Sequence, residues 1–492
     1  MRKASAQTKT LLVLGALVTA FTVGNLTVKQ ELKLQPRGNA PALFELRQTW
    51  QSAGDIIEFG RRVSRIGDAN GDGHADYVVH GMRESKGGAA TASSWWDTLQ
   101  VLSGVDGGLI CEIPSGYPAE CMGDGVVMVS SAGEKKLLVG GLRGLLSDAV
   151  FVFRIRTDVA TLEQVWARDS HCDLRGGGVA TVSEIASGRI IAVVVCAAGD
   201  GLTGECATRA REAARVQMER GKAQGGMDQE LRELRRVHAA SADADANKIS
   251  LSSHRLVDGT TLWTQLIVAH SVVGVVPISD WDGDGVSDVL CPYRREATRG
   301  EQSSSANGAS EVLVVSGATG NRVRAFAVPD GVDVYSACEV SDIDGDSQSD
   351  LVLGMPGYEV AGTVRGRVVA LSGATGVVLW SVVAGQDYSN VGWSIAAVGD
   401  LNRDSIPEVA VGAPAFERPS EVRILDGASG NLLQVLAPPV TDTAVSFGQS
   451  LATSVPSNSV GGLRLFVGAP NGSQCGAGGV YVYESVVPEP QR

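Results

Sequence analysis

A short acidic segment recurs four times in this chain, and its last three copies are evenly spaced. The copies are GDANGDGHAD from Gly67, SDWDGDGVSD from Ser279, SDIDGDSQSD from Ser341 and GDLNRDSIPE from Gly399. The first aspartates lie 62 residues apart between Asp280 and Asp342, and 58 residues apart between Asp342 and Asp400. Such a period predicts an array of similar structural units rather than the three ordinary domains that 492 residues alone would suggest.

Two further markers share this period. SGATG starts at Ser316 and Ser372, and DGASG follows at Asp426, at intervals of 56 and 54 residues. The triplets GMP, GAP and GAP start at Gly354, Gly412 and Gly468, at intervals of 58 and 56 residues. Short runs rich in Val, Leu and Ile lie between the markers, and in one unit they cover 336–340, 350–354, 367–372 and 377–382. Four short antiparallel strands per repeat are typical of a β-propeller blade.

The number of units predicts seven blades. The 212 residues from Asp68 to Asp280 leave room for two units without the acidic loop, and a third unit without it starts at Phe447. The segment 43–50, LFELRQTW, occupies the position of a fourth strand, so we expect it to complete the last blade and close the ring. The predicted fold is all-β: a seven-bladed β-propeller of four-stranded antiparallel blades over residues 43–486, closed by this N-terminal strand.

Four segments fall outside the predicted blades. Residues 1–24 place three basic residues before an uncharged stretch, which is the layout of a signal peptide or, if it is not cleaved, of a signal anchor. A linker, 25–42, and a tail, 487–492, flank the propeller. Residues 204–247 interrupt the third blade, and their Ala, Glu, Arg and Leu content predicts a helical insertion. This insertion is either a solvated helical hairpin or a recognition element.

Eight cysteines fit an oxidising compartment, and none forms a Cys-x-x-Cys pair, so zinc and redox motifs have no support. Cys111 with Cys121, and Cys196 with Cys206, are spaced to close local loops as disulfides. The alternative for each pair is that the cysteines are buried free thiols.

The acidic segments carry the chemistry. In each of them, side chains with oxygen atoms occupy positions 1, 3, 5 and 9 of a nine-residue loop, so that their oxygens converge and favour a hard cation. Calcium fits best because it accepts about six to eight oxygens at flexible angles. The predicted ligands are Asp68, Asn70, Asp72 and Asp76; Asp280, Asp282, Asp284 and Asp288; Asp342, Asp344, Asp346 and Asp350; and Asp400, Asn402, Asp404 and Glu408.

The alternative for these loops is a set of ordinary Asp-Gly and Asn-Gly hairpin turns. Four copies in register, with clustered carboxylates that would repel one another without a cation, favour calcium. Gly73 and Gly285 stand at position 6 of the first two loops, where a tight turn is expected. Ser347 and Ser405 replace glycine there in the other two, at a cost of about 1 kcal/mol for the turn in the third loop.

Together these features resemble the FG-GAP repeat family, the β-propeller at the N-terminal end of integrin α subunits and in many exported bacterial proteins. The resemblance rests on Phe59-Gly60, Phe447-Gly448, the two GAP triplets and the acidic loops, and it covers roughly residues 43–486. It implies calcium loops between the first and second strands on one face of the propeller, and ligand binding on the opposite face. The chain has no RGD-type sequence, so adhesion in the integrin manner is not expected.

Long loops between second and third strands, at 82–96, 201–247 and 293–310, are expected to project from the face opposite the acidic loops. Trp95 and Trp96 in the first of these loops are candidate ligand anchors. The alternative is that both indoles pack beneath their own loop. The expected partner is an extracellular protein or a polysaccharide.

The net charge and the absence of common catalytic motifs limit the functions that this chain can have. Lys plus Arg number 42 against 55 Asp plus Glu, a net charge of −13, and no basic block occurs, which excludes nucleic acid as a partner. No membrane contact is expected beyond the possible N-terminal anchor. No GxSxG, HExxH or phosphate-loop motif is present. We therefore expect a calcium-binding interaction module. We expect it to be secreted, on the cell surface or in the periplasm. The alternative is an enzyme, such as a calcium-dependent polysaccharide lyase of propeller fold.

Overall fold

The fold is all-β over the part of the chain that the structure describes. The computed structural model describes residues 45–84, 95–112, 120–131, 134–142, 148–170, 179–184, 186, 189–198, 248–255, 260–269, 271–272, 274–294, 310–385, 389–415, 419–438, 446–454, 463–470 and 477–486. Within these ranges the chain forms β-strands and one 3-10 turn, Pro329–Gly331, and no α-helix. No helix in these ranges has the length and apolar character needed to cross a membrane.

Antiparallel sheets of four strands are the unit of the fold. The first such sheet contains β9 (Val179–Glu184), β10 (Arg189–Ala198), β11 (Lys248–Arg255) and β12 (Thr261–Val268). In the next, a divided first strand, β13 (Ser271–Val272) and β14 (Val276–Ile278), pairs with β15 (Asp288–Arg294), which is followed by β16 (Ser310–Val315) and β17 (Arg322–Ala327).

Two further sheets follow the same order. One contains β18 (Ser336–Val340), β19 (Asp350–Met355), β22 (Arg367–Leu371) and β23 (Val378–Val383), with a small hairpin of β20 (Glu359–Val360) and β21 (Thr363–Val364) between its second and third strands. The other contains β24 (Ser394–Gly399), β25 (Glu408–Ala413), β26 (Glu421–Leu425) and β27 (Leu432–Leu436).

The remaining strands form one sheet of eleven, because one long strand is shared. Its order is β28 (Ser450–Ser454), β29 (Arg464–Ala469), β30 (Ala477–Val486), β1 (Glu45–Gly67), β2 (Asp76–Glu84), β3 (Trp95–Leu102), β4 (Leu109–Glu112), β8 (Thr161–Ser170), β7 (Asp148–Arg156), β6 (Glu134–Leu142) and β5 (Glu120–Ser131). A single parallel bridge, Glu112 to Thr161, joins β4 to β8. The sheet therefore consists of three four-stranded sets, two of which share β1.

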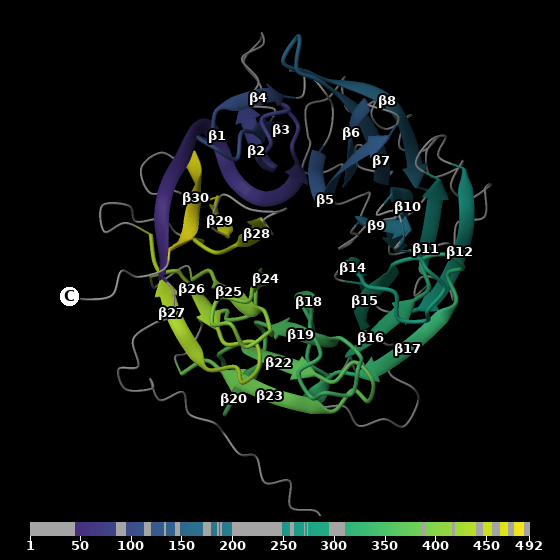
Figure 1. The fold of residues 1–492 in the computed structure, drawn as a ribbon, viewed down its shortest axis with the longest axis vertical. Helices are drawn as coiled ribbons and strands as arrows, with labels where there is room; N and C mark the ends of the chain where they lie inside the picture. The colour runs from purple at the N-terminus through teal and green to yellow at the C-terminus, as the bar shows by residue number, and fades with distance from the viewer. Residues whose placement is uncertain are drawn as a thin grey trace, which may run out of the picture. The chain divides into compact units, whose positions relative to one another are not determined.

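The N-terminal strand pairs with the C-terminal one, as the sequence predicts. The first part of β1 runs antiparallel to β30, from Glu45 opposite Val486 to Ala53 opposite Gly479, and Figure 1 draws the two strands side by side. The second part, from Ile57 to Gly67, pairs with β2. One strand thus belongs to both the last and the first four-stranded set.

The strands predicted for the unit with the third acidic loop match β18, β19, β22 and β23 to within one residue at each end. The prediction placed Trp95 and Trp96 in a loop, whereas they are the first two residues of β3, opposite Glu84 and Arg83 of β2. The signal segment 1–24, the linker 25–42, the helical insertion 204–247 and the tail 487–492 lie outside the described residues.

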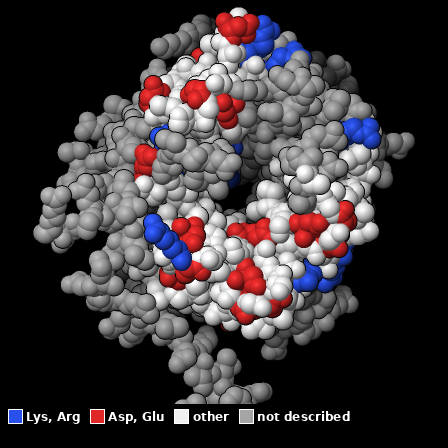
Figure 2. Space-filling model, in the orientation of Figure 1, with Lys and Arg blue, Asp and Glu red and all other residues white. Residues whose placement is uncertain are grey.

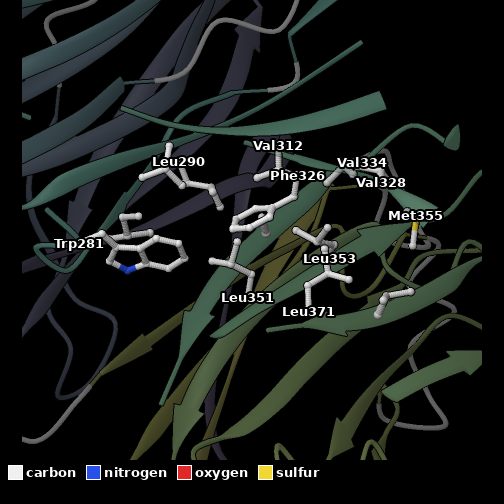
Figure 3. Close-up of a cluster of buried hydrophobic side chains, with 14 residues drawn as sticks. Trp281, Leu290, Val312, Phe326, Val328, Val334, Leu351, Leu353, Met355 and Leu371 are labelled. Atoms are coloured by element: carbon white, nitrogen blue, oxygen red, sulfur yellow. The ribbon is translucent and has the colours of Figure 1, made fainter. Parts of the chain in front are cut away.

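The core lies between neighbouring sheets, which explains why the middle strands are apolar without interruption. All six residues of β19 and all six of β25 are buried. Leu351 and Leu353 of β19 pack against Trp281 and Phe326 of the preceding sheet (Figure 3), whereas Val352 belongs to the cluster shared with the following sheet. A strand covered on both faces loses the alternation of apolar and polar residues.

Glycines of the FG and GAP markers meet where one sheet adjoins the next. Gly60 has a φ of +90°, and a Cβ there would lie 2.3 Å from the carbonyl oxygen of Gly479. A Cβ on Gly468 would lie 2.1 Å from the carbonyl oxygen of Gly60, and the same close approach joins Gly412 to Gly448 at 2.0 Å. The repeat keeps these glycines because backbone of one sheet touches backbone of the next.

Candidate metal centres

Each acidic segment is a loop between the first and second strands of a four-stranded set. The four loops join β1 to β2, β14 to β15, β18 to β19 and β24 to β25, so all of them leave their sheets at corresponding strand ends. On the face drawn in Figure 2, acidic side chains gather in several separate clusters, while Lys and Arg side chains are fewer. The acidic loops are therefore structurally equivalent sites.

The aspartate at position 1 organises the backbone of its loop. In the second loop, Asp280 Oδ1 accepts a hydrogen bond of 2.7 Å from the Gly283 amide, and Oδ2 accepts one of 2.8 Å from the Gly285 amide. Asp68, Asp342 and Asp400 accept equivalent bonds from the amides at positions 4 and 6 of their own loops. This scheme curls the loop around the carboxylate at position 1.

The same curl requires left-handed backbone at positions 4 and 6. Glycine occupies both positions in the first two loops, with φ of +78° at Gly283 and +89° at Gly285. Ser347 and Ser405 adopt φ of +72° and +73° at position 6, so the turn predicted to be strained is retained without glycine. Arg403, with φ +67°, is a second strained position in the fourth loop that the sequence did not reveal.

The acid at position 9 is the buried end of each loop. Asp76, Asp288, Asp350 and Glu408 are all fully buried. Asp288 Oδ2 accepts a bond of 2.8 Å from the Trp281 amide, and Oδ1 accepts one of 3.1 Å from the Gly317 amide of the SGATG turn. Asp76 and Asp350 are held in the same way, by Gly104 and Gly373 respectively. The acidic loop and the glycine marker are thus two parts of one structure.

Burial shifts the proton equilibrium of these acids in the absence of a cation. Loss of solvation raises the pKa of the Asp288 carboxyl to about 6 and that of Glu408 to about 7. The pKa values of Asp76 and Asp350 are raised for the same reason, against amide hydrogen bonds that lower them. A cation beside these carboxylates would offset the cost of burying their charge.

Glu408 differs from the three aspartates at position 9. Its Oε2 accepts a hydrogen bond from the Leu401 amide. Its Oε1 has no hydrogen-bond partner among the described residues, although the side chain is fully buried. A buried oxygen without a donor costs free energy, and a cation ligated by that oxygen would remove the cost.

Three of the four loops bring carboxylate oxygens together. Ligand atoms of Asp280, Asp282 and Asp288 lie within 4.8 Å of one another, and the same holds for the groups Asp342, Asp344 and Asp350, and Asp400, Asp404 and Glu408. Asp284 and Asp346 at position 5 instead accept hydrogen bonds from the hydroxyls of Ser316 and Ser372, at 3.2 and 3.3 Å. In the first loop the Asn70 amide donates to Asp72 over 2.8 Å. The donor set is all oxygen, which suits a hard divalent cation.

Among the cysteines and tryptophans that the sequence analysis singled out, only Cys111 has a side chain that the structure describes. Cys111 and Cys291 are buried free thiols, and Cys338 is a half-buried free thiol. The side chains of Cys121, Cys196 and Cys206 are not among those that the structure describes. The side chains of Trp95 and Trp96 also lie outside them.

An aromatic pair was missed by sequence reasoning. The rings of Tyr335 and Trp393 are 5.3 Å apart between centroids, and Tyr335 is 47% exposed. Each residue directly precedes the first strand of its sheet, at the end away from the acidic loop. The signal that would have found them is their shared offset, one residue before the serine that opens β18 and β24.

Four-stranded antiparallel sheets that repeat along a chain are the architecture of β-propellers. A family model described as FG-GAP repeat matches residues 391–425, which contain β24, the fourth acidic loop, β25 and β26. Integrin alpha-3 of Mus musculus is 36% identical over 104 residues, covering 20% of this chain and 10% of the relative. Integrin alpha-11 of Homo sapiens is 32% identical over 148 residues, covering 27% of this chain and 12% of the relative.

The family model and these relatives support an FG-GAP/integrin α β-propeller family for this chain. Integrin alpha pat-2 of Caenorhabditis briggsae is a further relative, 26% identical over 162 residues, or 30% of this chain and 13% of the relative. The match to each of these relatives spans only a small part of the relative's length, and so concerns the repeats rather than the whole protein.

Proposed function

We propose that this chain is an exported, calcium-stabilised β-propeller that binds an extracellular protein or polysaccharide through the face opposite its acidic loops. The observation that carries the proposal is the common scheme of the four loops, each curled around its first aspartate and closed by a buried acid at position 9. The resemblance to FG-GAP repeats and integrin α subunits supports the same conclusion, because it implies ligand binding on the face opposite the acidic loops.

The propeller has seven blades in this proposal. Support comes from contacts between strands that start successive four-stranded sets. Each contacts the next in the cyclic order β1, β5, β9, β14, β18, β24, β28 and back to β1. The shared strand β1 joins the last set to the first, so the ring has no free sheet edge at its closure.

Calcium is the cation in this proposal. Asp280, Asp282 and Asp288 supply one site, with equivalent residues in the third and fourth loops, and the first loop supplies Asp68, Asn70, Asp72 and Asp76. All-oxygen ligands and a flexible loop match calcium better than magnesium, which demands a nearly ideal octahedron. When bound, the ion supplies positive charge that neutralises clustered carboxylates and so stabilises the blade.

Ligand binding is assigned to the strand ends away from the acidic loops. Tyr335 and Trp393 form an aromatic surface there on two adjacent sheets, and exposed aromatic rings are frequent anchors for sugars and proteins. Trp95 and Trp96 are the first residues of β3, at the same end of their sheet, and remain candidate anchors.

Two measurements test the proposal. Titration calorimetry of the protein without its first 24 residues is expected to show two or more calcium sites, with dissociation constants of roughly 0.1 to 1 mM as in extracellular modules. Glycan and protein arrays are expected to show binding in the presence of calcium. This binding should be lost in Tyr335→Ala. It should be kept in the control variant Tyr358→Ala, because Tyr358 is half-buried and does not take part in the aromatic pair. Turnover of acidic polysaccharides, or absence of any calcium heat, contradicts the proposal.

A further inference from the structure

Glu339 makes an unusual set of contacts with the second acidic loop, although it belongs to the next sheet. Its Oε2 accepts a hydrogen bond of 2.8 Å from the Ser279 amide. Its Oε1 accepts one of 2.5 Å from the Ser279 hydroxyl and one of 2.9 Å from the indole Nε1 of Trp281. The carboxylate therefore holds the residues on both sides of Asp280, which is position 1 of the loop.

Trp281 connects this contact to the rest of the site. Its main-chain amide donates to Asp288 at position 9, so one residue bonds to both the buried acid of the loop and Glu339. Its ring is 7% exposed and packs at the edge of the cluster in Figure 3, with Phe326 edge-on at 6.5 Å between centroids. The Arg324 guanidinium lies 5.6 Å from the centroid of the same ring. Movement of the loop would therefore disturb the interior between two sheets.

The third and fourth loops lack this arrangement. Their residues at position 2 are Ile343 and Leu401, whose side chains have no N–H group to donate. The residues that occupy the place of Glu339 in the strands β24 and β28 are Ala397 and Thr453, and the Thr453 hydroxyl donates to a backbone carbonyl, that of Ala397, at 3.0 Å. These two loops are internal controls for the second.

We infer that Glu339 is a positioning residue for the cation site of the loop 280–288, and that it couples cation binding there to the contact between two adjacent sheets. The inference rests on the proposed cation binding by the acidic loops. Glu339 fixes the backbone around Asp280 before the ion arrives, so less conformational freedom is lost on binding. Residues that orient metal ligands typically change metal affinity by roughly 10- to 100-fold when they are replaced.

The test uses terbium as the probe, because this trivalent ion prefers oxygen ligands and its emission is sensitised by a nearby indole. Trp281 is part of the second loop, whereas the other three acidic loops contain no tryptophan. Trp263, Trp281 and Trp380 lie against the glycine turns of the second, third and fourth loops. The emission that is followed is therefore the component lost both in Trp281→Phe and in Asp282→Ala with Asp284→Ala. In Glu339→Gln the midpoint of the sensitised titration is expected to rise roughly 10- to 100-fold.

Glu359→Gln is the matched control. It removes the same charge from an exposed residue of the β20–β21 hairpin, and its midpoint is expected to stay within about twofold of the wild type. A milder variant, Ser279→Ala, removes one donor to Glu339 and keeps the amide bond, so a smaller weakening in the same direction is expected. It also keeps the test valid if Glu339→Gln does not fold.

Thermal unfolding separates positioning from plain packing. If Glu339 positions the cation site, Glu339→Gln lowers Tm by more in calcium than in chelator. If the contact is purely structural, its loss lowers Tm equally in both. An unchanged terbium midpoint in Glu339→Gln and Ser279→Ala, with normal wild-type binding, overturns the inference and leaves cation binding intact. A wild-type protein with neither sensitised emission nor calcium heat overturns the proposed cation binding itself.

Discussion

The Ser450 hydroxyl donates a hydrogen bond of 3.0 Å to the carbonyl oxygen of Gly60, across 390 residues of sequence. The same bond joins Ser394 to Gly448 at 2.7 Å and Ser336 to Gly392 at 2.9 Å, in both cases between consecutive sheets. The boundary between the last four-stranded set and the first is therefore built like the boundaries within the repeat.

Replacing either serine is expected to have the same effect. Ser450→Ala and Ser394→Ala each leave a glycine carbonyl without its hydroxyl donor, which should lower the free energy of unfolding by about 1 kcal/mol. Chemical denaturation of both variants checks this. A loss in Ser394→Ala with none in Ser450→Ala would show that the closing boundary is not equivalent to the others in solution.

The glycines at these boundaries predict a graded pair of substitutions. Gly60 and Gly73 have similar φ values, +90° and +86°, but an added Cβ meets the Gly479 oxygen at 2.3 Å in the first case and nothing within 4 Å in the second. Gly73→Ala should therefore cost about 1 kcal/mol of backbone strain alone. Gly60→Ala should cost roughly 3 kcal/mol or more, because backbone must also move apart. Denaturation in chelator, which removes any effect on the cation, measures both; equal losses would contradict the steric argument.

Periodicity allowed much of this fold to be predicted, because each unit repeats three markers with fixed roles. The strands β18, β19, β22 and β23 and the pairing of β1 with β30 follow from spacing alone. Contacts between units could not be predicted in the same way. The bond that the Trp281 indole donates to Glu339 joins two repeats at unrelated positions, and the Tyr335–Trp393 pair depends on how two sheets adjoin. The first has no local sequence signal, and the second has only the shared offset of its residues, one before the serine that opens β18 and β24.

The acidic loops show the same division within one site. Alternate oxygens at positions 1, 3, 5 and 9 are visible in the sequence, and so is the strained serine at position 6. The partner of the position 9 acid is not visible, because it is a backbone amide of the glycine marker about 28 residues later, as for Asp76 and Gly104. The unpaired oxygen of Glu408 likewise follows from burial, which depends on packing.

Calcium should stabilise the protein through the second loop. Asp282→Ala with Asp284→Ala is expected to lower stability by about 1 to 3 kcal/mol at 10 mM calcium, given the expected affinity, and to change it little in chelator. Asp106→Ala with Asp158→Ala removes the same charge from two exposed residues outside the acidic loops and is the control. Differential scanning calorimetry with and without calcium compares the two pairs. Equal losses in chelator and in calcium would remove the support for a cation at this loop.

Loss of the N-terminal strand should leave an open sheet edge. Deletion of residues 41–52 removes the partner of β30 from Val480 to Val486 and exposes the backbone donors and acceptors of that strand. Unpaired strands tend to associate, so oligomers or aggregates are expected in light scattering after gel filtration. Deletion of residues 25–40 in the linker is the control and should leave a monomeric profile unchanged. A truncated chain that behaves like this control would refute the closing role of β1.

The insertion 204–247 should be dispensable for folding. The strands on either side of it, β10 and β11, pair continuously from Ala192 opposite Arg255 to Ala198 opposite Ile249, so the hairpin ladder is complete without the insertion. Loop-closure entropy depends only weakly on loop length, so a short Gly-Ser turn in its place should change the free energy of unfolding by less than about 1 kcal/mol. Circular dichroism during thermal unfolding, together with calcium titration, should give a Tm within a few degrees of the wild type and unchanged calcium binding. Any partner that the insertion recognises should then be lost from array binding. A deletion variant that does not fold would show that the insertion forms part of the core.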